Sequence, residues 1–303
     1  MRYITFFPVR PRQAAAILSV CACFAHPAAM AQEVAEIPFW HAPEGTAALG
    51  GGLRFGQSPY LASDSDDERR LDLVPLYLYN GKYLFARGTS GGIHLVKNDA
   101  LELNFYTRYR FQRLDPDSNA YFAGLEEREQ SLDAGFEIAL RRRWGELSVD
   151  WVTDTLDRHN GNEARFSYRY RIDSGPLQFS PFISWTWQDA NLTNYYFGVS
   201  EAEATPERPA YLPGESQWIS FGLNASWQLT DNIVLFGNVA FAGTETEVRN
   251  SPLVEEDSLS SAFVGGTYQF GNVRKPDYIM DEDRIGEWSW RVNYGYQADG
   301  NIV

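Results

Sequence analysis

The sequence predicts an all-β protein, a transmembrane antiparallel up-and-down β-barrel of about 12 strands, with 10 as the alternative count, behind a cleaved N-terminal signal peptide. Three observations predict this fold. The chain opens with a secretory signal, long stretches alternate apolar and polar residues, and short turns alternate with long polar loops. Together they indicate the outer membrane of a Gram-negative bacterium as the destination.

The signal peptide occupies residues 1–31. Basic residues come first, an apolar run follows at residues 14–24, and small residues lead to the expected cleavage after Ala31. The apolar run is too short for a membrane-spanning helix, which needs about 20 apolar residues. Cys21 and Cys23 both lie inside this signal, so the mature chain offers no thiol for a disulfide, a metal site or a nucleophile.

The charge balance is strongly acidic. The whole chain has 26 basic and 40 acidic residues, and the signal removes three arginines but no acidic residue. Nucleic acid is therefore excluded as a partner, because phosphate backbones are bound through clustered Lys and Arg. With 44% hydrophobic and 15% aromatic residues, the chain is not disordered.

Alternation with a period of two is the main structural signal. Leu101, Leu103 and Phe105 fall on one face of a strand, and Glu102 and Asn104 fall on the other. The same alternation recurs at residues 132–141, 165–172 and 219–228. A soluble β-sandwich also alternates, but its strands average about 5 to 6 residues, whereas these run to roughly 10 to 14, long enough to cross a membrane at a tilt. No apolar stretch of about 18 residues follows the signal, which excludes a helical membrane protein.

The connections also alternate, between short turns and long polar loops. Short turns are expected at residues 80–81, 97–99, 144–145, 174–176 and 230–232, and long loops at 60–70, 115–130, 155–162, 189–217 and 244–257. Short turns and long loops alternate along the whole barrel if residues 83–87 and 92–96 form two short strands. The count from Ala47 to Phe270 is then twelve, an even number as such barrels require, and ten if this hairpin is bent or only partly inserted.

The expected organisation has four parts. Residues 1–31 are the signal peptide, 32–45 an N-terminal periplasmic segment, 46–270 the outer-membrane β-barrel, and 271–303 a polar linker with an aromatic C-terminal segment. The last part alternates again from Trp288 to Tyr296, and a thirteenth strand would break the even count. It is a periplasmic tail, a strand that replaces an earlier one, or the start of a second module.

Several motifs resemble the MipA/OmpV family of outer-membrane proteins. They are NYYFGVS at residues 194–200, RPAY at 208–211, SPLV at 251–254, GGTYQF at 265–270 and VPLYLYNG at 74–81. The resemblance implies an outer-membrane barrel and, for the founding member, a scaffold between a lytic transglycosylase and a bifunctional murein synthase. Barrels of this family usually end on an aromatic residue; here Phe270 occupies that place, although the chain continues to Val303.

Charged residues on the polar strand faces form the candidate site, a charged cluster in the barrel lumen. Its members are Glu102, Arg108, Arg110, Glu137, Arg141, Asp150, Arg165, Arg169 and Arg171. The arginines could line an anion path. The alternative, which we prefer, is that opposite charges pair and close a barrel of modest bore, because charges away from water are tolerated when paired.

Catalytic chemistry has little support in the sequence. The mature histidines, His41, His94 and His159, have no metal-ligand spacing, and His159 is expected to be solvated in a loop. Ser90 and His94 form the one nearby hydrolase pair, without a GxSxG motif. The acidic loop at residues 64–68 lacks the spacing of a calcium loop, so we expect a solvated loop. No catalytic, cofactor-binding or metal-binding residues are predicted.

The sequence thus favours a non-enzymatic outer-membrane scaffold or interaction protein. A narrow solute or ion channel is the second hypothesis, and a lipid hydrolase is the third. The expected partners are outer-membrane lipids and lipopolysaccharide, with a lytic transglycosylase and a murein synthase implied by the family resemblance.

Overall fold

The computed structural model describes residues 44–57, 60–61, 69–243, 245–255 and 258–270. The predicted signal peptide, most of the predicted segment 32–45, the acidic loop 64–68 and the predicted tail 271–303 lie outside the described residues. The strands are β1 (Thr46–Gln57), β2 (Arg69–Asn80), β3 (Leu84–Arg87), β4 (Ser90–Lys97), β5 (Leu101–Arg110), β6 (Ser131–Arg142), β7 (Gly145–Asp154), β8 (Asn162–Arg169), β9 (Ile172–Ser174), β10 (Leu177–Gln188), β11 (Ser216–Gln228), β12 (Ile233–Gly243) and β13 (Ser258–Phe270). The helices are η1 (Pro116–Ser118), η2 (Ala120–Phe122), α2 (Ala190–Phe197) and α3 (Thr246–Arg249).

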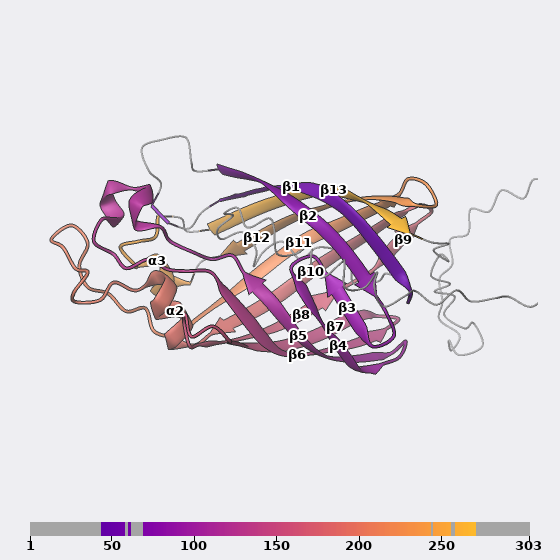
Figure 1. The fold of residues 1–303 in the computed structure, drawn as a ribbon, viewed down its shortest axis with the longest axis horizontal. Coiled ribbons are helices and arrows are strands. Elements are labelled where there is room, and N and C mark those ends of the chain that lie inside the picture. The colour runs from indigo at the N-terminus through magenta and orange to yellow at the C-terminus, as the bar shows by residue number, and fades with distance from the viewer. Residues whose placement is uncertain (1–43, 58–59, 62–68, 244, 256–257, 271–303) are drawn as a thin grey trace, which may run out of the picture.

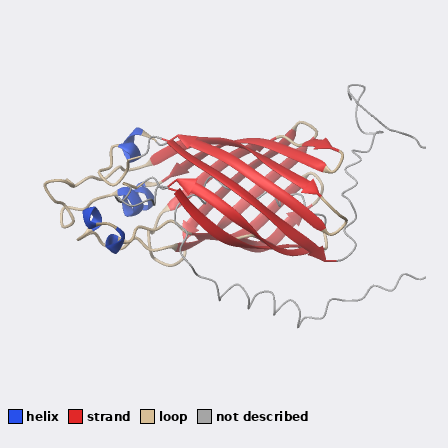
Figure 2. Ribbon diagram, turned by 90° about the horizontal axis from the view of Figure 1, so that it is seen from above, coloured by secondary structure: helices blue, strands red, loops and turns tan. Residues whose placement is uncertain are grey.

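The strands form one closed antiparallel barrel (Figures 1 and 2). Except for β8 and β9, each strand pairs with its neighbour along the chain, and β1 closes the barrel by pairing with β13 from Ala47 opposite Phe270 to Gly56 opposite Ser261. β8 and β9 both pair with β10, so these two short strands share one position in the wall. The wall therefore has the twelve predicted positions, and the predicted fold class is confirmed.

The predicted short hairpin is present as β3 and β4. Their turn is made at Gly88 and Thr89, where Gly88 takes a φ of +57° that suits glycine. β4 pairs with β5 along its length, whereas β3 pairs with β2 only from Leu78 to Asn80. The hairpin thus completes the even strand count but covers only part of the height of the wall.

The two ends of the barrel differ as predicted. At one end the strands are joined by tight turns; the Asn98 side chain, for example, accepts hydrogen bonds from the N–H groups of Ala100 and Leu101. At the other end long loops carry all four short helices, seen on the left in Figures 1 and 2. Barrels of this class keep short turns in the periplasm and long loops outside, which orients the chain. The loop between β10 and β11 contains helix α2, which the sequence reading treated only as a polar connection.

The two faces of the strands meet different surroundings, as the period of two predicts. On β11, Phe221 is 55% exposed and points outward, whereas Asn224 is 1% exposed and points into the lumen. The outward face of the barrel is apolar, and polar side chains gather inside. Among the residues that the structure describes, no helix has both the length and the apolar character needed to cross a membrane.

The outward face of β11 gives a test of this assignment. Phe221 lies near the middle of β11, so Phe221→Arg should lower the free energy of unfolding by about 2 to 4 kcal/mol, because the charge is placed near mid-bilayer. Leu229→Arg, at the exposed periplasmic end, should cost about 1 kcal/mol or less. Denaturant unfolding in lipid vesicles measures both. Equal losses for the two variants would contradict the placement of β11 in the membrane.

Candidate functional site

The predicted lumen residues lie on neighbouring strands of one side of the barrel. Eight of them project into the lumen and enter one set of contacts, together with residues that the sequence reading left out of the cluster. We call this set the lumen network: Arg87, Glu102, Arg108, Arg110, Asp133, Glu137, Arg141, Glu146, Asp150, Glu163, Arg165 and Arg169. The ninth predicted residue, Arg171, pairs at 2.8 Å with Asp173, whose side chain is 53% exposed next to the periplasmic turn.

The extracellular half of the network is built around two fully buried carboxylates. Glu163 on β8 contacts Arg108 at 3.0 Å, Arg110 at 2.9 Å and Arg165 at 3.1 Å. Asp133 on β6 contacts Arg110 at 2.7 Å and Arg108 at 3.4 Å. Both acidic side chains have 0% exposure. Each carboxylate is therefore held by arginines of β5, and Glu163 also by Arg165 of its own strand, so the network ties β5, β6 and β8 together on one side of the lumen.

The periplasmic half repeats the arrangement. Glu102 contacts Arg141 at 3.0 Å and Arg87 at 3.2 Å. Glu146 then contacts Arg141 at 2.6 Å and Arg169 at 3.3 Å. The result is an alternating row of acid and base from β3 to β8, and a row of this kind satisfies charges that are withdrawn from water.

A third group of contacts lies between the two halves. Glu137 accepts a hydrogen bond from the Asn104 amide at 2.6 Å and lies 3.7 Å from Arg87. Tyr106 donates its hydroxyl hydrogen to Asp150 at 3.0 Å. Asn104 has 0% exposure, so side chains pack closely around it on this side of the lumen.

The network is balanced in charge. Its six arginines face six carboxylates, and most of these side chains are less than one-tenth exposed. Removing either member of one of these buried pairs would leave an uncompensated charge, so the pairs hold one another in place. The arrangement packs paired charges along this side of the lumen and links the strands that carry them.

Sequence reasoning missed four members of the network: Arg87, Asp133, Glu146 and Glu163. The sequence did carry a signal for two of them. Asp133 lies an even number of positions from Glu137, and Glu163 from Arg165, so each pair shares one face of its strand. What the pattern could not give was which acid meets which base.

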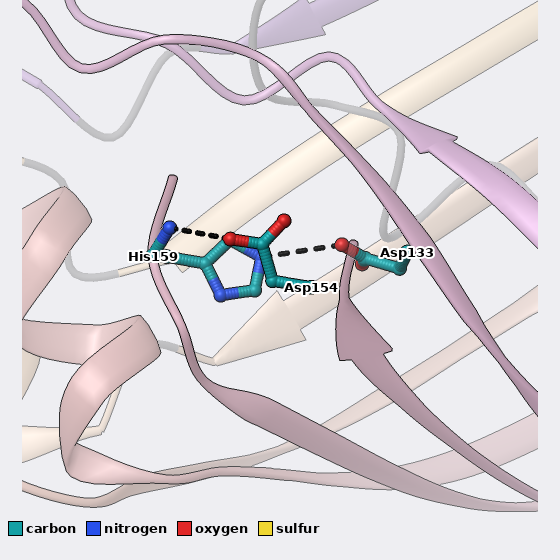
Figure 3. A group of neighbouring side chains, drawn as sticks. All are labelled: Asp133, Asp154 and His159. Atoms are coloured by element: carbon teal, nitrogen blue, oxygen red, sulfur yellow. Dashed lines mark hydrogen bonds and ion pairs between the residues drawn. The ribbon is translucent and has the colours of Figure 1, made fainter. Parts of the chain in front are cut away.

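Asp133, Asp154 and His159 come close enough to suggest a metal site (Figure 3). Gly161 donates its N–H to His159 Nδ1 at 3.1 Å, so Nε2 carries the ring hydrogen and donates it to Asp133 at 3.2 Å. The Asp154 carboxylate is saturated as well, since its two oxygens accept hydrogen bonds from Ser131 Oγ and from the backbone N–H groups of Leu156, Arg158, His159 and Asn160. The lone pairs that a metal would need are in use, so the group does not fit a metal.

His159 corrects one expectation. The sequence reading placed it in solvent, but the side chain is 4% exposed and bound to Asp133. The loop folds over the Asp154 carboxylate, with positive φ at Asp157 and Asn160, and this turn carries His159 back onto the lumen network. A local chain reversal of this kind has no signature in the alternation pattern.

The suspected hydrolase pair is not assembled. The Ser90 hydroxyl donates to the Arg87 carbonyl at 3.0 Å. His94 is buried, and its Nδ1 contacts the Asn104 side-chain oxygen at 2.7 Å. The serine is therefore engaged elsewhere than on the imidazole, and the pair lacks the contact that would activate a nucleophile.

The extracellular loops pack into a cap with its own hydrophobic core. Tyr196 on α2 is fully buried; its hydroxyl donates to the Glu129 carbonyl at 3.1 Å, and its carbonyl accepts from the Tyr60 hydroxyl at 3.0 Å. Ser251 donates to the Phe197 carbonyl at 2.6 Å. The buried core is formed by Tyr60, Leu114, Phe122, Leu125, Leu192, Tyr196, Phe197, Val199, Val248, Leu253 and Val254. Residues 194–200 and 251–254, which carry the family resemblance, thus build the cap.

Buried polar contacts hold the cap together. The Arg208 side chain, 1% exposed, donates to the carbonyl oxygens of Tyr121, Ala123 and Glu203. The Glu203 carboxylate pairs with Arg128 at 2.7 Å and accepts the N–H groups of Ser200 and Glu126. Burial acts to raise the pKa of Glu203, but the hydrogen bonds from these N–H groups and the Arg128 charge outweigh it and hold the pKa below its usual value.

The lumen network should make a large contribution to stability. Glu163→Gln should lower the free energy of unfolding by about 3 to 5 kcal/mol, because it leaves three buried arginines without their shared carboxylate. Asp173→Asn, which removes the partner of Arg171 at the exposed rim, should cost about 1 kcal/mol or less. Denaturant titration in vesicles compares the two. A small loss for Glu163→Gln would show that the network does not brace the wall.

The cap should loosen in acid. Because the folded pKa of Glu203 lies below the ordinary value of 4.5, its stabilisation is fully present above that pH and is lost as the pH falls through the folded pKa. Protection of the Ser200 and Glu126 amides against hydrogen exchange should therefore decrease on acidification. Glu203→Gln should remove this dependence. Protection that stays constant in the unmodified protein down to about pH 2 would contradict the role of Glu203.

Comparison with known proteins agrees with this architecture. The family described as MltA-interacting protein MipA matches residues 49–270. The MltA-interacting protein of Escherichia coli K12 is 28% identical over 230 residues, 75% of this chain and 91% of that protein. Outer membrane protein Omp26La of Vibrio anguillarum is 26% identical over 218 residues, which cover 71% of this chain and 83% of that protein. Outer membrane protein OmpV of Vibrio cholerae is 27% identical over 172 residues, which cover 57% of this chain and 66% of that protein. The chain is an outer-membrane β-barrel and belongs to the MipA/OmpV family.

Proposed function

We propose that this barrel is a non-enzymatic scaffold that holds murein-remodelling enzymes at the outer membrane. The observation that carries the proposal is the filled interior: the lumen network packs one side of the barrel with paired charges, and the cap covers the extracellular end. A barrel closed in this way offers its rims and outer surface to partners. One relative is named for its interaction with MltA, a lytic transglycosylase, which supports a periplasmic partner of that class.

The channel hypothesis has less support. A conducting lumen needs a continuous wet path, but Asn224 and Ala240 on the side opposite the network are 1% and 0% exposed. The scaffold hypothesis therefore accounts better for the buried side chains of the lumen. Planar-bilayer recording separates the two, since a scaffold of this build gives no discrete conductance steps.

A periplasmic partner would meet the short turns. The turn between β6 and β7 presents Arg142, Arg143 and Trp144, all exposed, and the Trp144 ring stacks on Tyr168 with centroids 6.3 Å apart. The turn between β2 and β3 presents Lys82 and Tyr83, and Tyr83 is 66% exposed. Exposed arginine and aromatic side chains are enriched where proteins bind one another, so these turns are the proposed contact.

Capture of a purified enzyme tests the proposal. The mature barrel, refolded in detergent and immobilised by an affinity tag, should retain purified MltA from Escherichia coli. The double variant Arg142→Glu, Arg143→Glu should weaken retention several-fold, because the rim charge is reversed where the partner docks. The matched control is Glu126→Lys, Glu127→Lys in the extracellular cap, which should retain MltA unchanged.

Two outcomes would contradict the scaffold. Absence of retention by the unmodified barrel removes the proposed partner. Equal loss in the periplasmic and extracellular double variants would indicate non-specific charge binding rather than a periplasmic docking site.

A further inference from the structure

The sequence contains two Asn-Gly dipeptides, Asn80-Gly81 and Asn160-Gly161. An asparagine followed by glycine can modify itself, because the backbone nitrogen of the glycine attacks the side-chain carbonyl carbon of the asparagine and ammonia leaves. The reaction is favoured by a carboxamide that is free to turn, by a base that takes the glycine N–H proton, and by water that opens the ring. The two dipeptides differ in these respects.

Asn160 presents a free carboxamide to solvent. It lies in the extracellular loop between β7 and β8, takes a φ of +50° and is exposed. Its backbone is held on both sides, since its N–H donates to Asp154 at 3.0 Å and its carbonyl accepts from the Asn191 side chain at 3.0 Å. Within the described part of the chain, the Asn160 side chain itself makes no hydrogen bond. It can therefore turn toward the next residue, and water reaches it.

His159 places a base on the attacking nitrogen. The Gly161 N–H donates to His159 Nδ1 at 3.1 Å. His159 Nε2 donates to Asp133 at 3.2 Å (Figure 3), and this bond holds the ring with its Nδ1 lone pair aimed at Gly161. A general base must lie within about 2.6 to 3.2 Å of the atom whose proton it takes, and the distance meets this requirement. The Asp133 carboxylate also stabilises the imidazolium that the transfer creates.

The packing of Gly161 fixes the position of its N–H. A Cβ at residue 161 would lie 2.5 Å from Asp189 Oδ1 and 2.5 Å from the Leu192 backbone nitrogen, so only glycine fits against the start of α2. The Gly161 carbonyl accepts from the Asp154 N–H at 3.2 Å. These contacts keep the N–H of residue 161 on His159. The absence of a side chain at Gly161 also leaves its nitrogen open to the Asn160 carboxamide.

The other dipeptide lacks these features. Asn80 is 7% exposed, and its side-chain oxygen accepts a hydrogen bond from Lys97 at 2.8 Å. The Gly81 N–H donates to the Leu84 carbonyl at 2.9 Å, and a carbonyl oxygen is too weak a base to take the proton. Asn80-Gly81 is thus a matched reference within the same molecule.

We propose that Asn160-Gly161 is a self-modification site, where the Asp133–His159 pair supplies the base that converts Asn160 to aspartate or isoaspartate. His159 Nδ1 takes the Gly161 proton, and the Gly161 nitrogen forms a bond to Asn160 Cγ. The bond from Cγ to Nδ2 breaks, and Nδ2 leaves as ammonia with the proton that His159 returns. Water then opens the cyclic imide at either carbonyl, so the step needs no oxidant and no cofactor.

The modification acts on the link between the cap and the lumen network. In the imide, Gly161 has no N–H, so its hydrogen bond to His159 is lost. Opening to isoaspartate routes the backbone through the side chain and lengthens the turn by one methylene. Both products place a new carboxylate near Asp154, which already accepts the Asn160 N–H. The modification therefore loosens the turn that holds His159 against Asp133.

Peptide mapping by mass spectrometry tests the proposal. The mature barrel, refolded in detergent, is incubated in mildly alkaline buffer, and water labelled with heavy oxygen separates conversion during incubation from conversion during digestion. In the folded protein, residue 160 should convert at least about tenfold faster than residue 80, because a positioned general base contributes about 10²- to 10⁴-fold. Denaturation in urea should slow residue 160, since the base is no longer placed, and speed residue 80, since its carboxamide is freed.

Two variants isolate the base and the site. His159→Gln retains a side chain that can bind Asp133 but has no basic nitrogen, so conversion at residue 160 should fall at least about tenfold while residue 80 is unchanged. Asn160→Gly, which suits the positive φ, should keep the fold and abolish the modification.

Three results would overturn the proposal: equal rates at residues 160 and 80 in the folded barrel, faster conversion of residue 160 after denaturation, or an unchanged rate in His159→Gln. The first two comparisons use the unmodified sequence, so they hold even where a variant fails to fold. None of these readouts depends on a periplasmic partner.

Discussion

The need to pair every backbone N–H and C=O within the bilayer governs the rest of this structure. The chain meets it by closing β1 onto β13, so that almost the whole wall is internally hydrogen-bonded. Closure then divides the side chains into two populations with opposite solvents. Those facing outward must be apolar, and those facing inward are cut off from both lipid and bulk water. Charges inside can be kept only in pairs, which is why Glu163 and Asp133 are each surrounded by arginines.

The lumen network and the cap are mechanically connected through one carboxylate. Asp133 binds Arg110 through one oxygen and His159 through the other. His159 in turn lies against Tyr196, with ring centroids 5.9 Å apart, and Tyr196 is part of the buried core of the cap. A displacement of the cap therefore has to disturb a buried ion pair. This contact attaches the extracellular loops, which in other proteins are ordinarily mobile, to the charged network of the barrel.

The sequence was sufficient to predict the strands of the wall and their two faces, but it was insufficient to predict which side chains pair inside the barrel. Alternation assigned Phe221 to lipid and Asn224 to the lumen, and the even-number rule recovered the β3–β4 hairpin from two very short segments. Both rules act on local patterns. The arginine partners of Glu163 include Arg108 and Arg110, which lie 55 and 53 positions away in the sequence, as well as Arg165 two positions away. Which residues meet at such separations depends on strand register and on the twist of the barrel. His159 and the buried Arg208 depend on loop folding, which has no period to read.

The places where the governing constraint is relaxed are where interactions with other molecules should be sought. A largely paired wall and a lumen lined by paired charges leave little unsatisfied chemistry, whereas the periplasmic turns expose Tyr83 and Trp144, and among the described residues β2 pairs with β3 only from Leu78 to Asn80. The short hairpin is the point at which the pairing rule is met least completely, because β3 has only four residues and pairs with β2 only from Leu78 to Asn80.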